Sequence, residues 1–183
     1  PSYLASITRN TAFRLAREVE IQRCISAENR SEYTPAKETV ITKEFLDEME
    51  LFFREHPAAA GKNLHFRKPL PAYTVYTDPS LLSRILMNMI INALEATDKG
   101  GTVTVSGVHG KDAISFSVHN PALIPADVAN RVFQRNFSTK DDPGRGFGTW
   151  SMKLFGERIL QGSVGFTSTP GAGTVFTFTL PEE

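Results

Sequence analysis

The sequence predicts an α+β domain, a two-layer α/β sandwich with helices on one face of a mixed, largely antiparallel sheet, preceded by an N-terminal helix. Strand-like segments in the second half of the chain alternate apolar and polar residues, as half-buried antiparallel strands do. Other segments repeat their apolar residues at helical spacing. Because each kind of element has one apolar face to bury, helices and sheet are expected to pack on each other as two layers.

Residues 1–34 are expected to form an appendage with a linker, and residues 35–183 the main domain. Residues 4–29 repeat apolar groups at helical spacing, at Leu4, Ile7, Ala12, Leu15, Val19 and Ile25. This pattern predicts an amphipathic helix that buries its apolar stripe against a partner helix or against its own domain. The following segment "ENRSEYTPAKE" is the expected linker, because it breaks the pattern and Pro35 cannot continue a helix.

The main domain is expected to contain four helices between its strands. Strands are expected at residues 38–41, 63–68, 73–77, 102–108 and 113–119, and in a hairpin of residues 164–169 and 174–180 around the turn "PGAG". Thr42 is the expected N-cap of the first helix. That helix carries Phe45, Met49, Phe52 and Phe53. Asp78 before Pro79 predicts the start of the second helix, which ends near "DKGG". The other two are expected at residues 126–133 and 148–160.

Composition limits the ligands and the location of the chain. Its 20 Lys and Arg residues balance 20 Asp and Glu residues, so bulk charge predicts neither nucleic-acid nor membrane binding. Cys24 is the only cysteine, which excludes an internal disulfide and fits a reducing compartment. There is no apolar run of about 18 residues that could span a bilayer. Since Pro1 lies in what reads as mid-helix sequence, we expect a cytoplasmic fragment of a longer protein, with membrane anchoring of that protein left open.

The segment "RILMNMIINALEAT", residues 84–97, combines an apolar helix face with a polar stripe. Asn88 and Asn92 lie four residues apart, and Glu95 follows three residues later, so the three side chains share one side of a helix. One interpretation is structural, with the asparagines bonded to neighbouring backbone. The other is functional, because asparagine oxygens are neutral ligands suited to a Mg²⁺ ion that takes its charge balance from phosphates.

The segment "DDPGRGFGTWSMK" favours the functional interpretation. Gly144, Gly146 and Gly148 alternate before a helix that begins near Thr149. Alternating glycines allow backbone amides to surround an anion, and a helix N-terminus adds its positive end. Arg145 lies within the loop and could reach a phosphate. A plain surface loop is the alternative when this segment is taken alone, but together with the asparagine helix it predicts a nucleotide–Mg²⁺ site.

At this point the sequence resembles the catalytic, ATP-binding domain of sensor histidine kinases, which belong to the superfamily of gyrase, Hsp90 and MutL. "LMNMIINALEAT" resembles the asparagine helix of that family, in which the second asparagine, here Asn92, ligates Mg²⁺. "RVFQRNFSTK" resembles the phenylalanine segment before the lid, and "GRGFGTWSMK" resembles the glycine lid with its following helix. "GAGTVFTFTLP" resembles the glycine turn and final strand. The four motifs occur in the family's order and cover roughly residues 36–181.

The resemblance implies ATP and Mg²⁺ as cofactors and transfer of the γ-phosphate to a histidine. It implies catalytic roles for Asn88 and Arg145, and Asn92 as the metal ligand. The residues implied to contact the nucleotide are Asn88, Asn92, Glu95, His119, Asn120, Lys140, Gly144, Arg145, Gly146, Phe147, Gly148, Thr149 and Thr174. The implied partners are an upstream phosphoacceptor helix of the same or a partner chain and a response-regulator receiver domain, with a homodimeric parent and no nucleic acid.

The sequence departs from the family at the base-binding motif. The family places Asp-x-Gly-x-Gly after the strand before the lid, where the aspartate accepts the adenine amino group. Alignment on Ile124 puts His119 in the place of that aspartate, and Pro121 and Leu123 in the places of the glycines. A neutral imidazole can accept one hydrogen bond, and Asn120 offers an amide oxygen beside it, so His119 and Asn120 are expected to face the base. A nucleotide-binding or protein-docking module without catalysis is the alternative function that this departure supports.

Two further departures concern the chemistry. ATP-hydrolysing relatives carry a water-activating glutamate at the position of Asn88, and asparagine has no titratable group that could act as a base. Asn88 therefore favours phosphoryl transfer over an ATP-driven clamp. None of the four histidines begins the family's phosphoacceptor motif; they are His56, His65, His109 and His119. The acceptor is expected upstream of Pro1, and residues 4–29 then resemble the end of the second dimerisation helix.

Overall fold

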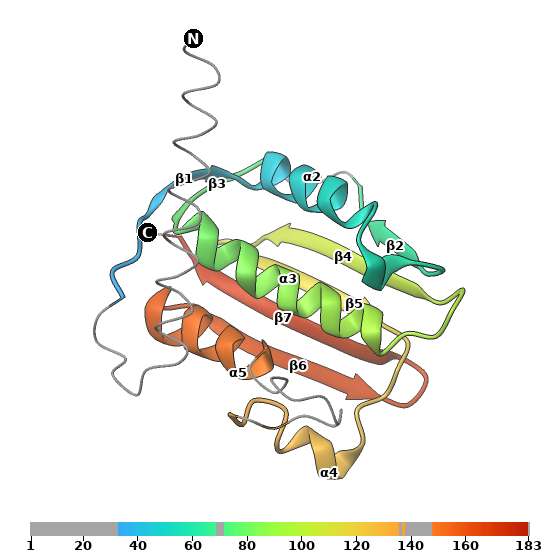
Figure 1. Ribbon diagram of the computed structural model, residues 1–183. Helices are drawn as coiled ribbons and strands as arrows, with labels where there is room; N and C mark the ends of the chain where they lie inside the picture. Colours follow the sequence, from blue (N-terminus) through green and yellow to red (C-terminus); the bar gives the residue numbers. More distant parts are fainter. Residues whose placement is uncertain (1–32, 69–71, 136, 138–147, 183) are drawn as a thin grey trace.

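The computed structural model describes residues 33–68, 72–135, 137 and 148–182 (Figure 1). The helix predicted at residues 4–29 lies outside this part of the chain. The elements, in chain order, are β1 (Glu38–Ile41), α2 (Thr42–Phe53), a 3-10 turn (Pro57–Ala59), β2 (Asn63–Phe66), β3 (Thr74–Thr77), α3 (Pro79–Glu95), β4 (Thr102–His109), β5 (Ala113–Asn120), α4 (Ala126–Ala129), α5 (Gly148–Lys153), a π-helical segment (Leu154–Ile159), β6 (Ser163–Thr169) and β7 (Gly173–Pro181). None of the described helices is long and apolar enough to cross a membrane.

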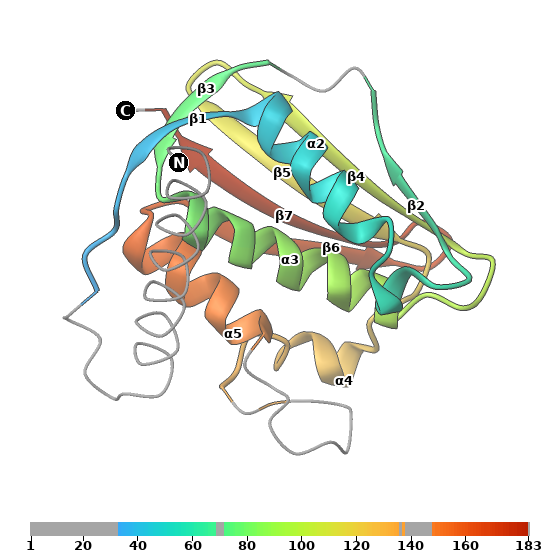
Figure 2. The same ribbon diagram turned by 45° about the horizontal axis from the view of Figure 1, so that its top comes forward.

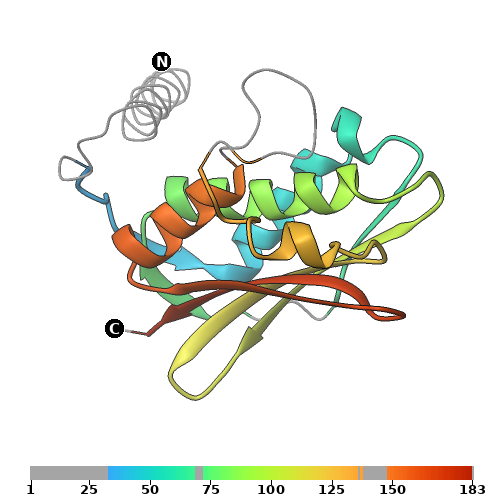
Figure 3. The ribbon, with the colours of Figure 1, turned by 90° about the horizontal axis from the view of Figure 1, so that it is seen from below.

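The strands form two sheets. The larger has the order β2-β4-β5-β7-β6; β2 pairs with β4 in parallel, and every other pair is antiparallel. The smaller is the antiparallel pair β1–β3. Helices α2, α3 and α5 cover one face of the large sheet, and the view from below shows the two layers in profile (Figure 3). The predicted mixed, largely antiparallel sheet with helices on one face is confirmed.

The two layers meet in a continuous apolar core. Every second residue of β5 is buried, from Ile114 through Phe116 to Val118. The apolar stripe of α3 packs over this face, and its residues Ile85, Leu86, Met89 and Ile90 are fully buried. Burying one such side chain stabilises the fold by about 1.5–3 kcal/mol, so this stripe fixes how α3 is rotated. The polar stripe of α3 is therefore held at the side of the helix, where α5 lies beside it (Figure 2).

Two local expectations need correction. The N-cap of α2 is Ile41 rather than Thr42. The fully buried Thr42 hydroxyl instead donates to Tyr73 O at 3.0 Å and accepts from Tyr73 N at 3.2 Å, which ties α2 to the start of β3. Phe52 is 50% exposed, whereas the other three apolar residues predicted on this helix are buried. The helix predicted at residues 126–133 ends at Ala129, and beyond it the Val132 carbonyl accepts the Thr149 hydroxyl.

The helix predicted at residues 148–160 is present but changes its winding. It is α-helical up to Lys153 and π-helical from Leu154 to Ile159. Gly156 lies in the wider part, where a Cβ would approach Val164 Cγ2 to 2.5 Å. No side chain fits between the helix and the sheet at this point, so glycine permits the close packing of the two layers.

Candidate functional site

The helix that carries the asparagines is fixed at its start by a buried carboxylate. Asp78, 1% exposed, accepts through Oδ1 from Ser80 N at 2.9 Å and from Leu81 N at 3.2 Å, which caps α3. Its Oδ2 accepts from Tyr33 Oη at 3.0 Å and from Ala36 N at 2.8 Å. Because negative charge is favourable at a helix N-terminus, one side chain both caps α3 and fastens the expected linker to it.

The end of α3 is fixed as well. The Thr97 hydroxyl donates to Ala93 O at 2.6 Å, and the Lys62 ammonium donates to Leu94 O at 2.6 Å. These contacts satisfy carbonyls that a helix end leaves unpaired, and they place a positive charge where the helix dipole is negative. The helix is thus held at both ends, with its polar stripe in a defined place.

The polar stripe lies against the N-terminus of α5. Asn88 Nδ2 donates to Ser151 Oγ at 3.1 Å, and Ser151 Oγ donates to Gly148 O at 2.8 Å. A Cβ on Gly148 would lie 3.7 Å from Asn88 Oδ1 and 3.9 Å from Asn92 Nδ2. Both asparagines therefore border the residue at which the glycine segment enters α5.

Asn92 carries a polar group that its surroundings do not satisfy. Its Nδ2 is buried and has no hydrogen-bond partner among the described residues. Buried polar groups in folded proteins are nearly always paired, so an unpaired one is a candidate contact for a ligand. The prediction that Asn88 and Asn92 act as a pair is consistent with this arrangement. Glu95 is exposed in the last turn of the same helix.

Neutral amide groups fit a metal ion that arrives with its own anions. In residues 33–68, 72–135, 137 and 148–182 there is no group of three or more His, Cys, Asp or Glu side chains that could hold a metal. The side chains next to Gly148 are amides, and an amide oxygen is a suitable ligand for Mg²⁺ bound to phosphates. The unpaired Nδ2 of Asn92 needs an acceptor, such as a phosphate oxygen, and the amide oxygens of Asn88 and Asn92 suit the metal.

The end of β5 forms a second part of the candidate site. β5 and α3 both end on the side of the domain where α4 follows (Figures 1 and 2). Asn120, the last residue of β5, is 3% exposed and continues the buried, helix-facing alternation of that strand. Its register partner on β7 is Thr174, which is also buried. Asn120 is thus a polar side chain at the inner edge of the core.

Hydrogen bonds join the loop after Asn120 to the β6–β7 hairpin. Thr174 Oγ1 donates to Ala122 O at 2.7 Å and lies 2.8 Å from Ser168 Oγ, which accepts from Ile124 N at 2.9 Å. Gly173 has φ +75°, and a Cβ there would lie 2.3 Å from Asn120 O. The Thr174 hydroxyl therefore supports the backbone of this loop. Glycine is required at position 173, because its backbone closely approaches Asn120 O.

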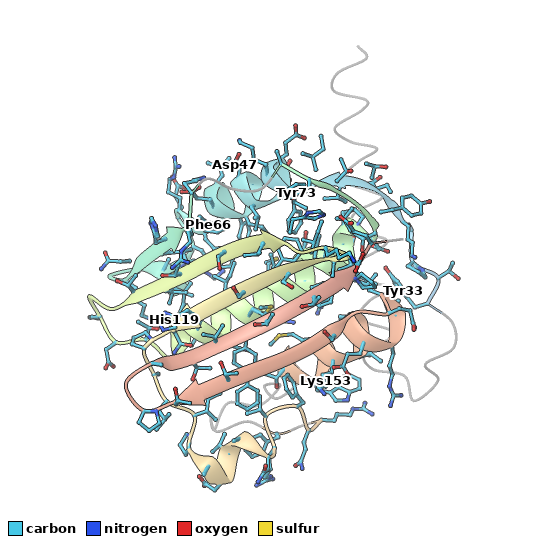
Figure 4. The ribbon with its side chains drawn as sticks, turned by 180° about the vertical axis from the view of Figure 1, so that it is seen from behind. Tyr33, Asp47, Phe66, Tyr73, His119 and Lys153 are labelled. Carbon is cyan, nitrogen blue, oxygen red and sulfur yellow. The ribbon has the colours of Figure 1, made fainter. Side chains whose placement is uncertain are left out.

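His119 does not share the face of Asn120. In a strand, successive side chains point to opposite faces, so His119 projects from the face of the sheet that carries no helix (Figure 4). Its Nε2 donates to Ala172 O at 2.8 Å on that exposed side. The structure therefore does not bring His119 and Asn120 together on one face of the sheet.

The residues on both sides of the glycine segment are anchored. The Thr149 hydroxyl donates to the Val132 carbonyl, so its side chain is engaged in linking α5 to the chain after α4. The Phe133 ring packs against Phe166 and Phe176, with ring centroids 5.8 and 6.2 Å apart, and Lys153 Nζ lies 4.9 Å from its centre. The remaining predicted site residues lie outside the described part of the chain; they are Lys140, Gly144, Arg145, Gly146 and Phe147.

Sequence reasoning missed Ser151, Gly173 and Ser168. Ser151 contacts Asn88 across 63 positions of the chain, and no local pattern indicates a contact of that range. Gly173 could have been singled out from the turn "PGAG", where a left-handed residue is expected.

The comparisons with known sequences agree on one family. The sequence profile described as "Histidine kinase-, DNA gyrase B-, and HSP90-like ATPase" matches residues 77–183. The chain is similar to the adaptive-response sensory kinase SasA of Rippkaea orientalis, with 32% identity over 149 residues, 78% of this chain and 36% of that protein. It is also similar to the heme sensor protein HssS of Staphylococcus aureus, with 30% identity over 134 residues, 72% of this chain and 29% of that protein. The chain thus spans about a third of the length of these relatives.

The comparison with solved structures concerns the fold. The catalytic domain of histidine kinase ThkA superposes with a TM-score of 0.71 at 23% identity, over 80% of this chain and 95% of that chain. ThkA in complex with response regulator protein TrrA gives a TM-score of 0.73 at 21% identity, over 100% of this chain and 52% of that chain. At such identities the likeness shows a shared fold, and it confirms the predicted two-layer arrangement.

Proposed function

Because the chain belongs to the family of histidine kinase-, DNA gyrase B- and HSP90-like ATPases, we propose that residues 35–183 bind ATP with Mg²⁺ as the catalytic domain of a sensor histidine kinase. The observation that carries the proposal is the pair of asparagines beside the N-terminus of α5. The Nδ2 of Asn92 is buried and unpaired among the described residues, and Asn88 and Asn92 both border Gly148. A phosphate oxygen would accept a hydrogen bond from this Nδ2, and the amide oxygens of the pair would suit a metal bound to the same phosphates.

The proposed reaction transfers the γ-phosphoryl group of ATP to an imidazole nitrogen. The bond between the γ-phosphorus and the bridging oxygen breaks, a phosphorus–nitrogen bond forms, the ring releases its proton and ADP leaves. Bound Mg²⁺ neutralises charge on the phosphates. Asn92 is proposed to offer its oxygen to the metal, and Asn88 to assist directly or through water. Asn88 has no titratable group, so it positions ligands and does not activate water.

Contacts to the other parts of the nucleotide are proposed from the resemblance. Asn120 is proposed to face the base, supported by its place on the helix side of β5. Thr174 is proposed to hold the loop beside it. The residues proposed to wrap the phosphates are Lys140, Gly144, Arg145, Gly146, Phe147, Gly148 and Thr149, with Arg145 near the transferred group. Glu95 is proposed to border the same site from the end of α3.

The wider protein is proposed to supply the acceptor. Residues 1–34 are proposed to be the end of a dimerisation helix with its linker, and the acceptor histidine to lie upstream on the same or a partner chain. A structural relative is a histidine kinase in complex with a response regulator, which supports a receiver domain as the next acceptor. Because the proposed reaction consumes ATP, we propose a cytoplasmic location for the domain.

Calorimetric titration of the 183-residue chain with ATP and Mg²⁺ tests the proposal. We expect saturable heat in the unchanged chain. In Asn92→Ala the dissociation constant should rise at least about tenfold, since a metal ligand is lost. Asn63→Ala is the matched control, because Asn63 donates to Gly100 O on the exposed surface and its loss should leave binding unchanged. The absence of saturable heat in the unchanged chain contradicts the proposal and favours a docking module without nucleotide.

A further inference from the structure

We propose that Ser151 is a positioning residue that sets the orientation of the Asn88 amide, so that Asn88 Oδ1 is presented to the bound nucleotide and its metal. The inference rests on the proposed function for the identity of the ligand. The contact between the two side chains belongs to the unliganded protein, and it can be tested without any ligand.

The direction of each hydrogen bond follows from the groups involved. A hydroxyl has one hydrogen to donate. Ser151 Oγ lies 2.8 Å from Gly148 O, and a carbonyl can only accept, so the hydroxyl hydrogen is used there. The contact of 3.1 Å to Asn88 must then be donated by Asn88 Nδ2 to an oxygen lone pair. The amide of Asn88 therefore has one preferred orientation, with Oδ1 turned away from Ser151.

The free end of that amide points to the candidate site. Asn88 Oδ1 lies 3.7 Å from the position of a Cβ on Gly148, and Asn92 Nδ2 lies 3.9 Å from the same position. If the Asn88 amide turned over, its NH₂ group would take the place of this oxygen, and Asn88 would no longer present an oxygen beside Gly148. Ser151 thus decides whether Asn88 offers an oxygen or an NH₂ group.

A purely helical role explains Ser151 poorly. Ser151 is 2% exposed within α5. Serine at an interior helix position forms helix less readily than alanine, and a bond to a preceding carbonyl adds little. The hydroxyl joins two helices, however, because its second contact reaches Asn88 on α3. It lies one helical turn after Gly148, so it links the start of α5 to the asparagine pair.

The first measurement follows the side-chain amide of Asn88 by nitrogen-15 NMR of the unliganded chain. Its NH₂ signal is identified as the pair missing from the spectrum of Asn88→Ala. We expect Ser151→Ala to shift this pair and to speed its hydrogen exchange, because the acceptor is gone. Ser151→Thr keeps the hydroxyl and should leave the pair near its original position. An unchanged pair in Ser151→Ala overturns the inference.

The second measurement is a double-mutant cycle on the dissociation constant of ATP with Mg²⁺. Losing the oriented oxygen should weaken binding about fivefold in Ser151→Ala, whereas Ser151→Thr should stay within about twofold. In the Asn88→Ala background, Ser151→Ala should have no further effect, because the residue acts through Asn88. Equal weakening in both backgrounds identifies a general structural role and overturns the inference, as does unchanged affinity of Ser151→Ala.

The control is Ser115→Ala. Ser115 Oγ lies 2.8 Å from Thr179 Oγ1 on the face of the sheet that carries no helix, so this variant loses a hydroxyl contact of similar length without touching α3. It should change neither the Asn88 signal nor binding. If the unchanged chain fails to bind ATP, the proposed function falls and the ligand role of Ser151 falls with it; the amide signal then decides separately whether Ser151 orients Asn88.

Discussion

At the scale of single residues, the proposed base-facing residue Asn120 is an amide, whereas the base-binding motif of the related family uses a carboxylate. A carboxylate only accepts hydrogen bonds, whereas an amide can present either its oxygen or its NH₂ group. Adenine offers a donor and an acceptor at its pairing edge, and guanine offers the reverse. Asn120 is therefore expected to distinguish the two bases weakly.

Asn120→Asp should raise the preference for ATP over GTP by about tenfold, because the carboxylate accepts from the adenine amino group and repels the guanine carbonyl. Competition of GTP against labelled ATP measures the ratio of the two affinities. His119→Ala should leave this ratio unchanged, since His119 projects from the opposite face of the sheet. If the ratio responds to His119→Ala and not to Asn120→Asp, then His119 contacts the base and Asn120 does not.

Gly173 gives a prediction about stability at the same scale. Its φ of +75° is strained for alanine, and a Cβ would also lie 2.3 Å from Asn120 O. Gly173→Ala should lower the free energy of unfolding by more than about 2 kcal/mol. Gly171 is the matched control, because it has φ +81° but nothing within 4 Å of a Cβ, so Gly171→Ala should cost only about 1 kcal/mol. Urea unfolding of both variants measures the difference, and equal losses would remove the argument from close approach.

At the scale of elements, the start of α3 is joined to the chain segment that contains Tyr33 and Ala36. Asp78 caps α3 and accepts from Tyr33 and from the Ala36 amide. Tyr33→Phe removes one of these donors and should cost about 1 kcal/mol. Asp78→Ala removes the cap as well and leaves several donors unpaired, so it should cost at least about 2 kcal/mol more. Urea unfolding tests the order; a Tyr33→Phe variant less stable than Asp78→Ala contradicts it.

Elements with local signals were predictable from the sequence. Asp78 before Pro79, and the hairpin turn before Gly173, are short-range signals, and the structure confirms both elements. The spacing of Asn88 and Asn92 was sufficient to place them on one side of a helix. The N-cap of α2 was not predictable, because Thr42 is engaged by Tyr73 across 31 positions. A threonine hydroxyl suits either role, and only the packed fold selects between them.

In the candidate site, too, features with a local sequence signal were predictable and long-range contacts were not. Buried residues at Ile114, Phe116 and Val118 set a phase that continues to Asn120, and this phase could have been read from the sequence. Alignment on Ile124 selects His119, whose side chain lies on the opposite face of β5. The contact of Ser151 with Asn88 joins two helices, and no repeat or motif within either helix indicates it.

At the scale of the whole molecule, ligand recognition has to come from local geometry. The chain has equal numbers of acidic and basic residues, so no general positive field attracts a nucleotide. The side chains that the structure brings to Gly148 are the amides of Asn88 and Asn92 and the hydroxyl of Ser151. Such groups bind phosphate through well-placed hydrogen bonds and a metal ion. Affinity for ATP is therefore expected to depend strongly on Mg²⁺, and chelation of the ion should weaken binding.

The last prediction separates phosphoryl transfer from hydrolysis. A positioned general base typically contributes about 10²–10⁴-fold to the rate of a proton transfer, and Asn88 cannot supply one. The 183-residue chain should therefore bind ATP while releasing phosphate only at the background rate. When the chain is extended upstream to include the preceding helix, it should become labelled by [γ-³²P]ATP. The label should be acid-labile and alkali-stable, as expected for phosphohistidine. Steady phosphate release by the 183-residue chain alone, without labelled protein, would instead identify an ATP-driven clamp. Asn92→Ala should abolish labelling if the site described above carries the reaction, and Asn63→Ala should not, since Asn63 lies on the exposed surface beside Gly100.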